Sequence, residues 1–313
     1  MHSEVPFEVN MNISRNFVLF LKVVVVGLAI PTTFSFLAAG QQIADDNSSQ
    51  NVWRPINQEN DELRIGMAAY KSGDLDEAIR HFQKAILLVP QDISPRMELG
   101  EALSRKVVSG VETPENLKIA QQAISVYQGI LDMPFRDPSP TPSFAHWRTV
   151  TAEKQIARIE FSIKKLDEAK EWQKKVLAED AKDAEAAYSI GVIDWMEAHQ
   201  TAQAALTQAG LKDDGMGNAK APAAVMAAIK TQNGALIEES LRYLNQAVEN
   251  RPDYADAMAY LNLAYLRKAD LDFGNEAART EDVAKAEEWS RKAHETRKAN
   301  EEKKAAGAEA AKS

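Results

Sequence analysis

The sequence predicts an all-α protein, an α-solenoid of about five helix-turn-helix units with insertions between helices and a capping helix at the C-terminus. Two observations carry this prediction. After residue 58, apolar residues recur at helical spacing, and no segment alternates apolar and polar residues as a strand would. In addition, a pattern of small, aromatic and proline residues recurs, with a period of about 34 residues where it is best preserved.

The pattern is clearest in residues 66–90, GMAAYKSGDLDEAIRHFQKAILLVP. Gly66 and Ala78 are twelve residues apart, with the turn residues Gly73 and Asp74 between them. We expect two antiparallel helices here, with Gly66 opposite Ala78, where small side chains allow close backbone approach. The second helix continues its buried stripe and ends at a proline, through Phe82, Ala85 and Pro90.

Later segments repeat parts of this pattern. Gly100 follows Gly66 by one full period, and Gly191 follows Ala157 by the same interval. The corresponding second helices are marked by Ala123, Tyr127, Ile130 and Pro134, by Ala169 and Val176, by Ser240, Leu244, Ala247 and Pro252, and by Ala286 and Ala293. The chain therefore holds about five related units.

Three insertions interrupt the period. About eleven extra residues lie between Gly100 and Ala123, a larger insert covers residues 205–234, and another dozen residues cover 271–282. In stacked arrays such insertions go to loops on one face, so we expect loops here. A Pro-rich segment at 133–146 is expected to split the array into a block of two units and a block of three.

The N-terminus has the layout of a secretory signal peptide. An apolar run with Arg15 and Lys22 near its start is followed by Ala38 and Gly40, at the −3 and −1 positions of a cut before Gln41. The alternative is a retained anchor, because residues 17–39 are long enough to act as a membrane tether. Both interpretations place the protein in the periplasm or envelope, either soluble after cleavage or anchored in the inner membrane.

The predicted organisation follows from these observations. It comprises a signal peptide or N-terminal membrane anchor at 1–40, a polar linker at 41–58, a first block of two units at 59–135, a Pro-rich linker at 136–149, a second block of three units with long inserts at 150–295, and a charged helical tail at 296–313. The start of the last helix, with Trp289 and Ala293, is expected to cap the array.

These units resemble the tetratricopeptide repeat (TPR), in which helix pairs stack into a solenoid. The resemblance is closest in residues 59–92 and 236–266 and covers roughly two-thirds of the chain. The inserts, together with residues 251–271, also resemble a group of exported bacterial TPR proteins, notably from Acidobacteria. In TPR arrays the first helix of each unit lines a groove that receives an extended peptide or a partner helix.

The resemblance implies a set of groove residues. They are Asn60, Leu63, Met67, Tyr70 and Lys71 in the first unit, Arg158 and Phe161 in the third, Tyr188, Val192 and Trp195 in the fourth, and Leu263, Leu266 and Arg267 in the fifth. Aromatic, methionine and arginine side chains are favoured at interfaces. The alternative is that several pack between units, because Tyr70 and Trp195 occupy equivalent positions and could belong to the core.

One known TPR ligand is not expected. Chaperone-binding TPR domains hold a terminal carboxylate with Lys and Asn at set groove positions. In this chain the matching positions hold Leu63 and Met67. We therefore predict no ligand that is recognised by its C-terminal carboxylate.

Composition and motifs argue against several other functions. A net charge of −9 gives no basic stripe to neutralise nucleic-acid phosphates. The absence of cysteine removes disulfides, thiolate metal sites and cysteine nucleophiles. None of the five histidines has the spacing of a metal site, and residues 212–218 read as an exposed Gly-rich loop without the ligands of a calcium site. We expect no enzyme activity, no cofactor, no metal and no nucleic-acid partner.

The leading hypothesis is a non-enzymatic scaffold or adaptor that binds a protein or peptide partner in the bacterial cell envelope. The alternative is a binding protein for a small envelope ligand, such as a glycan or lipid fragment, held between the inserts and the groove. A closed, buried pocket would favour the small ligand, and an open apolar groove would favour a peptide. An enzyme would need Asp213 or Asp214 to meet a helical glutamate.

Overall fold

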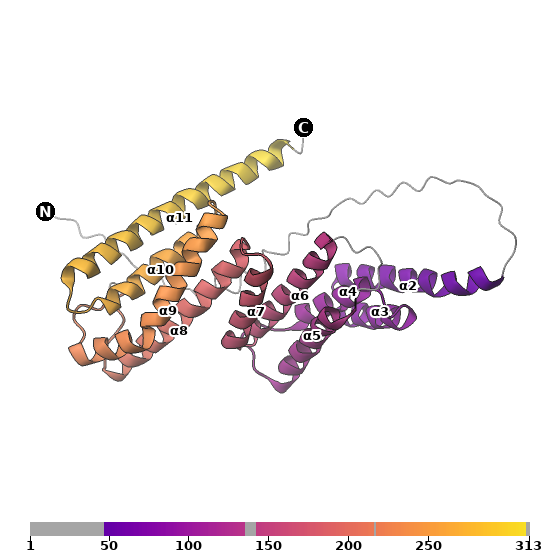
Figure 1. The fold of residues 1–313 in the computed structure, drawn as a ribbon, viewed down its shortest axis with the longest axis horizontal. Helices are drawn as coiled ribbons and strands as arrows, with labels where there is room; N and C mark the ends of the chain where they lie inside the picture. The colour runs from indigo at the N-terminus through magenta and orange to yellow at the C-terminus, as the bar shows by residue number, and fades with distance from the viewer. Residues whose placement is uncertain (1–46, 135–141, 216, 311–313) are drawn as a thin grey trace.

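The computed structural model describes residues 47–134, 142–215 and 217–310, and within these ranges the chain is helical, with no strand (Figure 1). The helices pair as α2 (Asn47–Ser72) with α3 (Leu75–Leu88), α4 (Ser94–Lys106) with α5 (Pro114–Asp132), α6 (Pro142–Ser162) with α7 (Leu166–Glu179), α8 (Ala184–Gln208) with α9 (Ala223–Asn250), and α10 (Ala255–Leu271) with α11 (Glu276–Ala310). The prediction of an all-α solenoid of about five helix pairs is confirmed.

Glycines of the first helices set how closely the paired helices approach. A Cβ atom added at Gly66 would lie 2.6 Å from the ring of Phe82, and one at Gly100 would lie 2.6 Å from the ring of Tyr127. Carbon atoms in contact normally lie about 3.5–4.0 Å apart, so only glycine fits at either position. The small residue was expected opposite Ala78, but the side chain that fills the space beside Gly66 is Phe82.

In the fourth unit, α8 and α9 also approach closely at a glycine. A Cβ atom at Gly191 would lie 2.7 Å from Cγ of Leu244 and 3.0 Å from the carbonyl oxygen of Ser240. The buried Ser240 hydroxyl donates a hydrogen bond of 2.7 Å to the carbonyl oxygen of Gly191. Here a backbone contact and a hydrogen bond hold together the two helices that the long insert separates in sequence.

The insertions lengthen helices more than they extend loops. The insert at 205–234 continues α8 to Gln208 and begins α9 at Ala223, which leaves residues 209–222 as the connection. The expectation of a loop was therefore wrong for more than half of this insert. The added turns are stable as helix because they bury a small apolar cluster of their own, formed by Ala202, Leu206, Met226 and Ile229.

Two predicted boundaries were also wrong. Residues 47–58 of the predicted polar linker belong to α2, and residues 142–149 of the predicted Pro-rich linker belong to α6. Pro142 is the first residue of α6. The backbone amide at this position makes no hydrogen bond within the helix, so a proline, which lacks the amide hydrogen, is tolerated there. The charged tail predicted at 296–313 is helical through Ala310, as the last turns of α11.

The predictions for residues 1–40 lie outside the described residues, and so does the proposed tether at 17–39. Among the described helices, none combines the length and the apolar character that crossing a bilayer requires.

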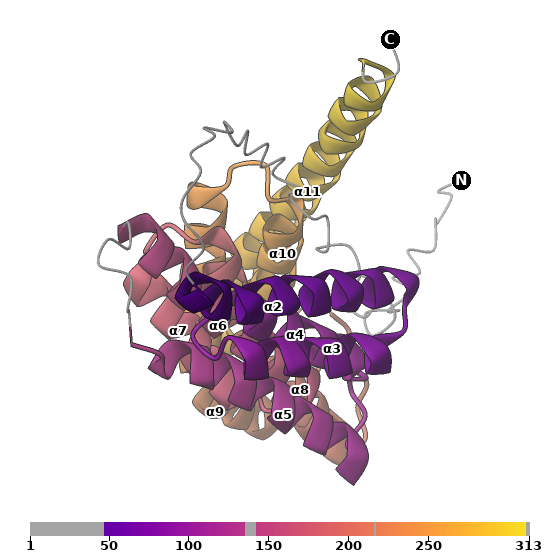
Figure 2. The same ribbon diagram turned by 90° about the vertical axis from the view of Figure 1, so that its right-hand side faces the viewer.

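The buried apolar residues form separate clusters on the two sides of α7. One cluster runs from α2 to α6, and the clusters of the second part lie among α8, α9 and α10. Helix α7 contributes only partly buried side chains to these clusters, Trp172 to the first and Leu177 to the second. We call α2–α7 the N-terminal half and α8–α11 the C-terminal half (Figures 1 and 2).

The division into blocks therefore falls one unit later than the Pro-rich segment suggested. Ile156 and Ile159 of α6, and Ile163 directly after it, are buried in the same cluster as Ile124 and Tyr127 of α5. Helix α6 thus continues the first core, although it follows the Pro-rich segment in sequence. The first core gives way to the second at α7, whose Trp172 packs on one and Leu177 on the other.

Helix α11 covers the end of the array. Ala286 and Ala293 are buried, and the Asn262 side chain of α10 donates a hydrogen bond of 2.8 Å to the carbonyl oxygen of Ala286. The C-terminal turns of α11 extend past the other helices, and residues 301–309 are exposed (Figure 2). The first half of this helix therefore caps the apolar core, as expected of a terminal element.

Replacement of Gly100 by alanine tests the close approach of helices. The added methyl group would overlap the fully buried ring of Tyr127, so Gly100→Ala should lower the free energy of unfolding by about 1–3 kcal/mol. Gly129→Ala is the matched control, because no atom lies within 4 Å of a Cβ there. That change should be neutral or stabilising by about 0.5–1 kcal/mol in urea denaturation. Equal stabilities for the two variants would contradict the packing argument.

Candidate functional site

The predicted groove residues lie on the first helices of the units, and the structure divides them by exposure. Lys71 is exposed, as is Asn60. Half-buried are Leu63, Met67, Tyr70, Arg158, Phe161, Tyr188, Leu263 and Leu266. Val192, Trp195 and Arg267 are buried, with exposed fractions of 2%, 4% and 4%. These last three cannot contact a partner in the described conformation.

A chain of polar contacts joins α2, α4 and α6, the first helices of units one to three. The Tyr70 hydroxyl of α2 donates to Oε1 of Glu101 on α4 at 3.4 Å, and Arg158 of α6 donates to Oε2 of the same glutamate at 3.0 Å. The Arg105 guanidinium lies 5.0 Å from the centre of the Tyr70 ring. Glu101 therefore connects two predicted groove residues that lie two units apart in the sequence.

Glu101 and Arg105 were missed at the level of sequence, although a signal for them existed. Glu101 follows Met67 by one full period of the repeat, and Arg105 follows Lys71 by the same interval. Because no groove position was assigned to the second unit, both were overlooked. The repeat spacing alone would have placed them beside the residues that they contact.

Burial shapes the acid–base chemistry of this polar region. Burial raises the pKa of Tyr70, and the charge of Glu101 raises it further while Arg105 opposes the rise. Burial also raises the pKa of Glu98, one turn before Glu101, and the negative charge of Glu101 adds to that effect. The surface of the first three units is thus made of half-buried charges that largely neutralise one another.

The corresponding surface of the last two units is aromatic. The Tyr188 ring lies 4.9 Å from the ring of Tyr254 and 5.7 Å from the ring of Tyr260. Trp195 meets the edge of Tyr260 at 5.3 Å and stacks on His199 at 4.9 Å. The alternative interpretation, packing between units, therefore holds for Trp195, while Tyr188 and Tyr260 are only half-buried.

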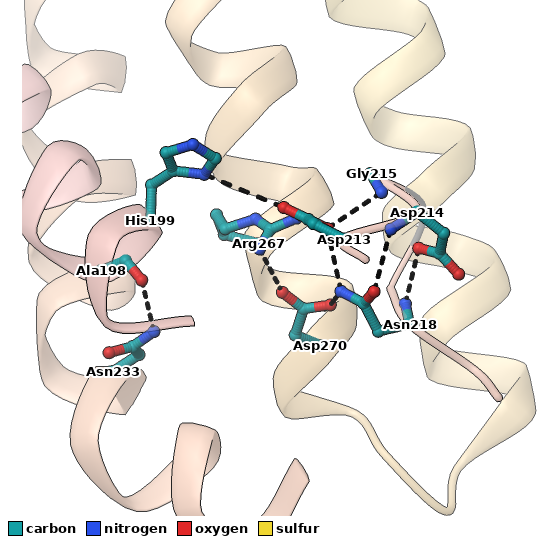
Figure 3. Close-up of polar contacts among 9 residues, drawn as sticks. All are labelled: Ala198, His199, Asp213, Asp214, Gly215, Asn218, Asn233, Arg267 and Asp270. Atoms are coloured by element: carbon teal, nitrogen blue, oxygen red, sulfur yellow. Dashed lines mark hydrogen bonds and ion pairs between the residues drawn. The ribbon is translucent and has the colours of Figure 1, made fainter. Parts of the chain in front are cut away.

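The buried Arg267 is held by the insert between α8 and α9 (Figure 3). It donates a hydrogen bond to Oδ1 of Asp213 at 2.7 Å, and its Nη1 forms an ion pair with Oδ2 of Asp270 at 3.0 Å. The Asn218 side chain donates to Oδ1 of Asp270 at 2.8 Å and to Oδ1 of Asp213 at 3.1 Å. The assignment of Arg267 to an open groove was wrong, because the connection at 209–222 covers it.

The interpretation of residues 212–218 as an exposed loop fits Lys212 and Asp214, which are exposed, but it was wrong for Gly217 and Asn218. Asn218 is buried, and Gly217 packs so closely on Ala269 of α10 that a Cβ would lie 2.9 Å from that residue's methyl carbon. Gly217 also has a φ of +87°, a conformation that glycine adopts without strain. We call the group formed by Asp213, Asn218, Arg267 and Asp270 the insert clamp.

The clamp holds two carboxylates against one guanidinium. Burial raises the pKa of Asp213, but Arg267 and the hydrogen bonds from Gly215 and Asn218 outweigh it and lower that pKa overall. Burial raises the pKa of Asp270 to about 6, against the opposing charge of Arg267. Burial and the charge of Arg267 also lower the pKa of His199, whose Nδ1 lies 4.0 Å from Oδ2 of Asp213.

This arrangement differs from the one that the enzyme hypothesis required. The acid that Asp213 meets is Asp270, and an arginine bridges the two, whereas the enzyme hypothesis required a helical glutamate. Within the described ranges, no group of three or more metal-binding side chains has the arrangement of a metal site.

The remaining contact between neighbouring first helices joins α6 of the N-terminal half to α8 of the C-terminal half. Lys154 of α6 pairs with Asp183 at 2.5 Å and with Glu185 of α8 at 3.2 Å. Every first helix thus contacts the next through side chains on one continuous surface. We call it the first-helix surface, formed by Met67, Tyr70, Lys71, Glu98, Glu101, Arg105, Lys154, Arg158, Phe161, Glu185, Tyr188, Tyr260 and Leu263.

Comparison with known proteins agrees with the repeat pattern. Residues 63–92 match the family model described as tetratricopeptide repeat. The chain is similar to the solved structure of MamA from Desulfovibrio magneticus RS-1, with 17% identity and a TM-score of 0.45 over 75% of this chain and 96% of that one. No curated protein matches the chain significantly. The resemblance to TPR proteins is confirmed, while the likeness to an exported acidobacterial group stays a prediction.

Two further solved structures are similar. YrrB, a TPR protein with an unusual peptide-binding site, shares 12% identity at a TM-score of 0.43, covering 81% of this chain and 98% of that one. The TPR2AB domain of yeast Sti1, in complex with pHSP90, shares 16% identity at a TM-score of 0.32, covering 78% and 95%.

Removal of one charge from the insert clamp should release the connection at 209–222. Breaking one partner of a buried ion pair costs about 3 kcal/mol, so Asp213→Asn should accelerate amide hydrogen exchange in residues 209–222 and in the last turn of α10. Lys212→Gln, at an exposed position in the same connection, is the control. Unchanged exchange in Asp213→Asn would mean that the clamp does not hold the insert.

Proposed function

We propose that this protein is a non-enzymatic TPR scaffold that binds a protein or peptide partner along its first-helix surface in the bacterial cell envelope. The observation that carries the proposal is the continuity of that surface. Tyr70, Glu101 and Arg158 join three first helices, and Tyr188 and Tyr260 join the last two. A partner segment crossing these helices would meet one unit after another without a break.

The size of the surface sets the size of the partner segment. Neighbouring helices pack about 8–10 Å apart, so five first helices span roughly 40 Å. An extended chain advances about 3.3 Å per residue, which gives a segment of roughly 12 residues. Half-buried aromatic and methionine side chains such as Tyr188, Tyr260 and Met67 are the anchors that such interfaces favour.

The small-ligand alternative has weaker support. It requires a cavity between the insert and the groove, and the insert clamp places Asp213 and Asn218 directly against Arg267 and Asp270 at that position. The envelope location rests on the signal-like layout of residues 11–41. An N-terminal sequence of the mature protein that begins at residue 41 would support it.

The binding surface can be tested with peptides selected from a display library of about 12 residues, the length that the surface requires. Tyr70→Ala and Lys71→Glu should each weaken the selected peptides by roughly five- to thirtyfold in calorimetry, or about 1–2 kcal/mol. Lys71 is exposed, so its replacement leaves packing intact.

Leu87→Ser supplies the matched control for that experiment. Leu87 is 80% exposed on α3, a second helix, and lies outside the first-helix surface. Its replacement should leave the affinity unchanged. A loss of affinity in Leu87→Ser with none in Lys71→Glu and Tyr70→Ala would refute the proposed surface.

A further inference from the structure

Three tyrosines gather where α8 meets α10. The ring of Tyr188, on α8, lies 4.9 Å from the ring of Tyr254, directly before α10, and 5.7 Å from the ring of Tyr260, on α10. All three residues are half-buried, so part of each side chain remains open to solvent. We call Tyr188, Tyr254 and Tyr260 the tyrosine cluster.

The hydroxyl groups of the tyrosine cluster are available to a ligand. None of them bonds to another described residue, and none belongs to the enclosed polar atoms that lack a partner, so all three reach solvent. Tyr70 of the N-terminal half differs, because its hydroxyl donates to Glu101. Burial raises the pKa of each tyrosine in the cluster, so the hydroxyls stay protonated and can donate.

The carboxylates beside the cluster, which would be its strongest acceptors, are already neutralised. Asp256 lies near all three tyrosines, because its charge raises the pKa of each, and its Oδ1 accepts a hydrogen bond of 3.2 Å from Arg297 of α11. Glu185 of α8 pairs with Arg251 at 3.3 Å and with Lys154 at 3.2 Å. The cluster therefore offers a ligand ring faces and hydroxyl donors.

A polyproline II helix fits this combination better than other peptide conformations. Proline has no backbone N–H, so a proline-rich segment presents carbonyl acceptors and few donors, and this helix forms no internal hydrogen bonds. Its rings pack on aromatic side chains, and its preformed shape lowers the entropy cost of binding. An extended strand without proline would bring N–H groups that need acceptors, and a glycan would bring many hydroxyl donors.

We propose that the tyrosine cluster binds a proline-rich segment of the partner in the polyproline II conformation. Proline rings of the segment pack on the tyrosine rings, and the tyrosine hydroxyls donate to its carbonyl oxygens. One turn of this helix holds three residues and extends about 9 Å, which suffices to cover the three neighbouring rings. The assignment rests on the proposed function and names the kind of segment that the aromatic part of the first-helix surface recognises.

Binding of a labelled oligoproline to the full chain tests the proposal, with fluorescence anisotropy as the readout. The probe is a synthetic peptide of about nine prolines, or three turns of the helix. A Gly–Ser peptide of the same length, which is flexible and has no rings, is the control. The oligoproline should bind and the Gly–Ser peptide should not. No binding of the oligoproline at about 1 mM, or binding of a chitin oligosaccharide in its place, would overturn the proposal.

Removal of single hydroxyls locates the site. Tyr188→Phe and Tyr260→Phe keep the rings and should each weaken oligoproline binding by about three- to tenfold, the loss of one hydrogen bond. Because these hydroxyls bond to no other described residue, both variants should unfold at the same temperature as the unmodified protein.

Tyr265→Phe is the matched control for these variants. Tyr265 is half-buried on the same helix as Tyr260, but its ring faces Lys285 of α11, 5.8 Å from the ring centre. This change should leave oligoproline binding as it was. Unchanged affinity in both Tyr188→Phe and Tyr260→Phe, or an equal loss in Tyr265→Phe, would place the site elsewhere and overturn the proposal.

Failure of this proposal can be told apart from failure of the proposed function. If library-selected peptides bind and depend on Tyr70 and Lys71 while the oligoproline does not bind, the chain is a peptide scaffold and only the assignment to proline is wrong. If neither kind of peptide binds, the proposed function is wrong as well.

Discussion

The contact between a glycine of the first helix and a bulky side chain of the second is the constraint on which the array depends. Where a Cβ would lie 2.6 Å from the Phe82 or Tyr127 ring, the helices can approach only because Gly66 and Gly100 lack one. This sets how closely the two helices of a pair approach. The stacking of the pairs brings every first helix against the next, which creates the first-helix surface.

That surface changes character along its length because different forces hold its two parts. In the N-terminal half, Glu101 accepts hydrogen bonds from Tyr70 and Arg158, so neighbouring helices are joined by partly exposed polar contacts. Such contacts contribute little stability and can exchange partners readily. In the C-terminal half the tyrosine rings pack on each other, and the buried Arg267 closes the end of the surface under the insert. One array therefore presents polar and aromatic side chains side by side.

The helices could be predicted from sequence because their cause is local and repeated. Gly66, Phe82 and Pro90 mark one helix pair, and the period of the repeat carries the pattern to Gly100. Residues 47–58 were missed as helix because no apolar stripe marks them. The burial of Trp195 and Arg267 was missed because a groove position and a packed position carry the same residue types. For Arg267 the deciding partner, Asp213, lies in an insert with no counterpart in the repeat.

Photo-crosslinking at chosen positions tests the central claim, that a partner binds on the first helices, most directly. A photoreactive phenylalanine analogue at Met67 or Leu263 should crosslink to a bound library-selected peptide, because both side chains belong to the first-helix surface. The same analogue at Leu87 or Gln121, exposed on the second helices α3 and α5, should give no crosslink. Crosslinks from Leu87 or Gln121, with none from Met67 and Leu263, would contradict the account.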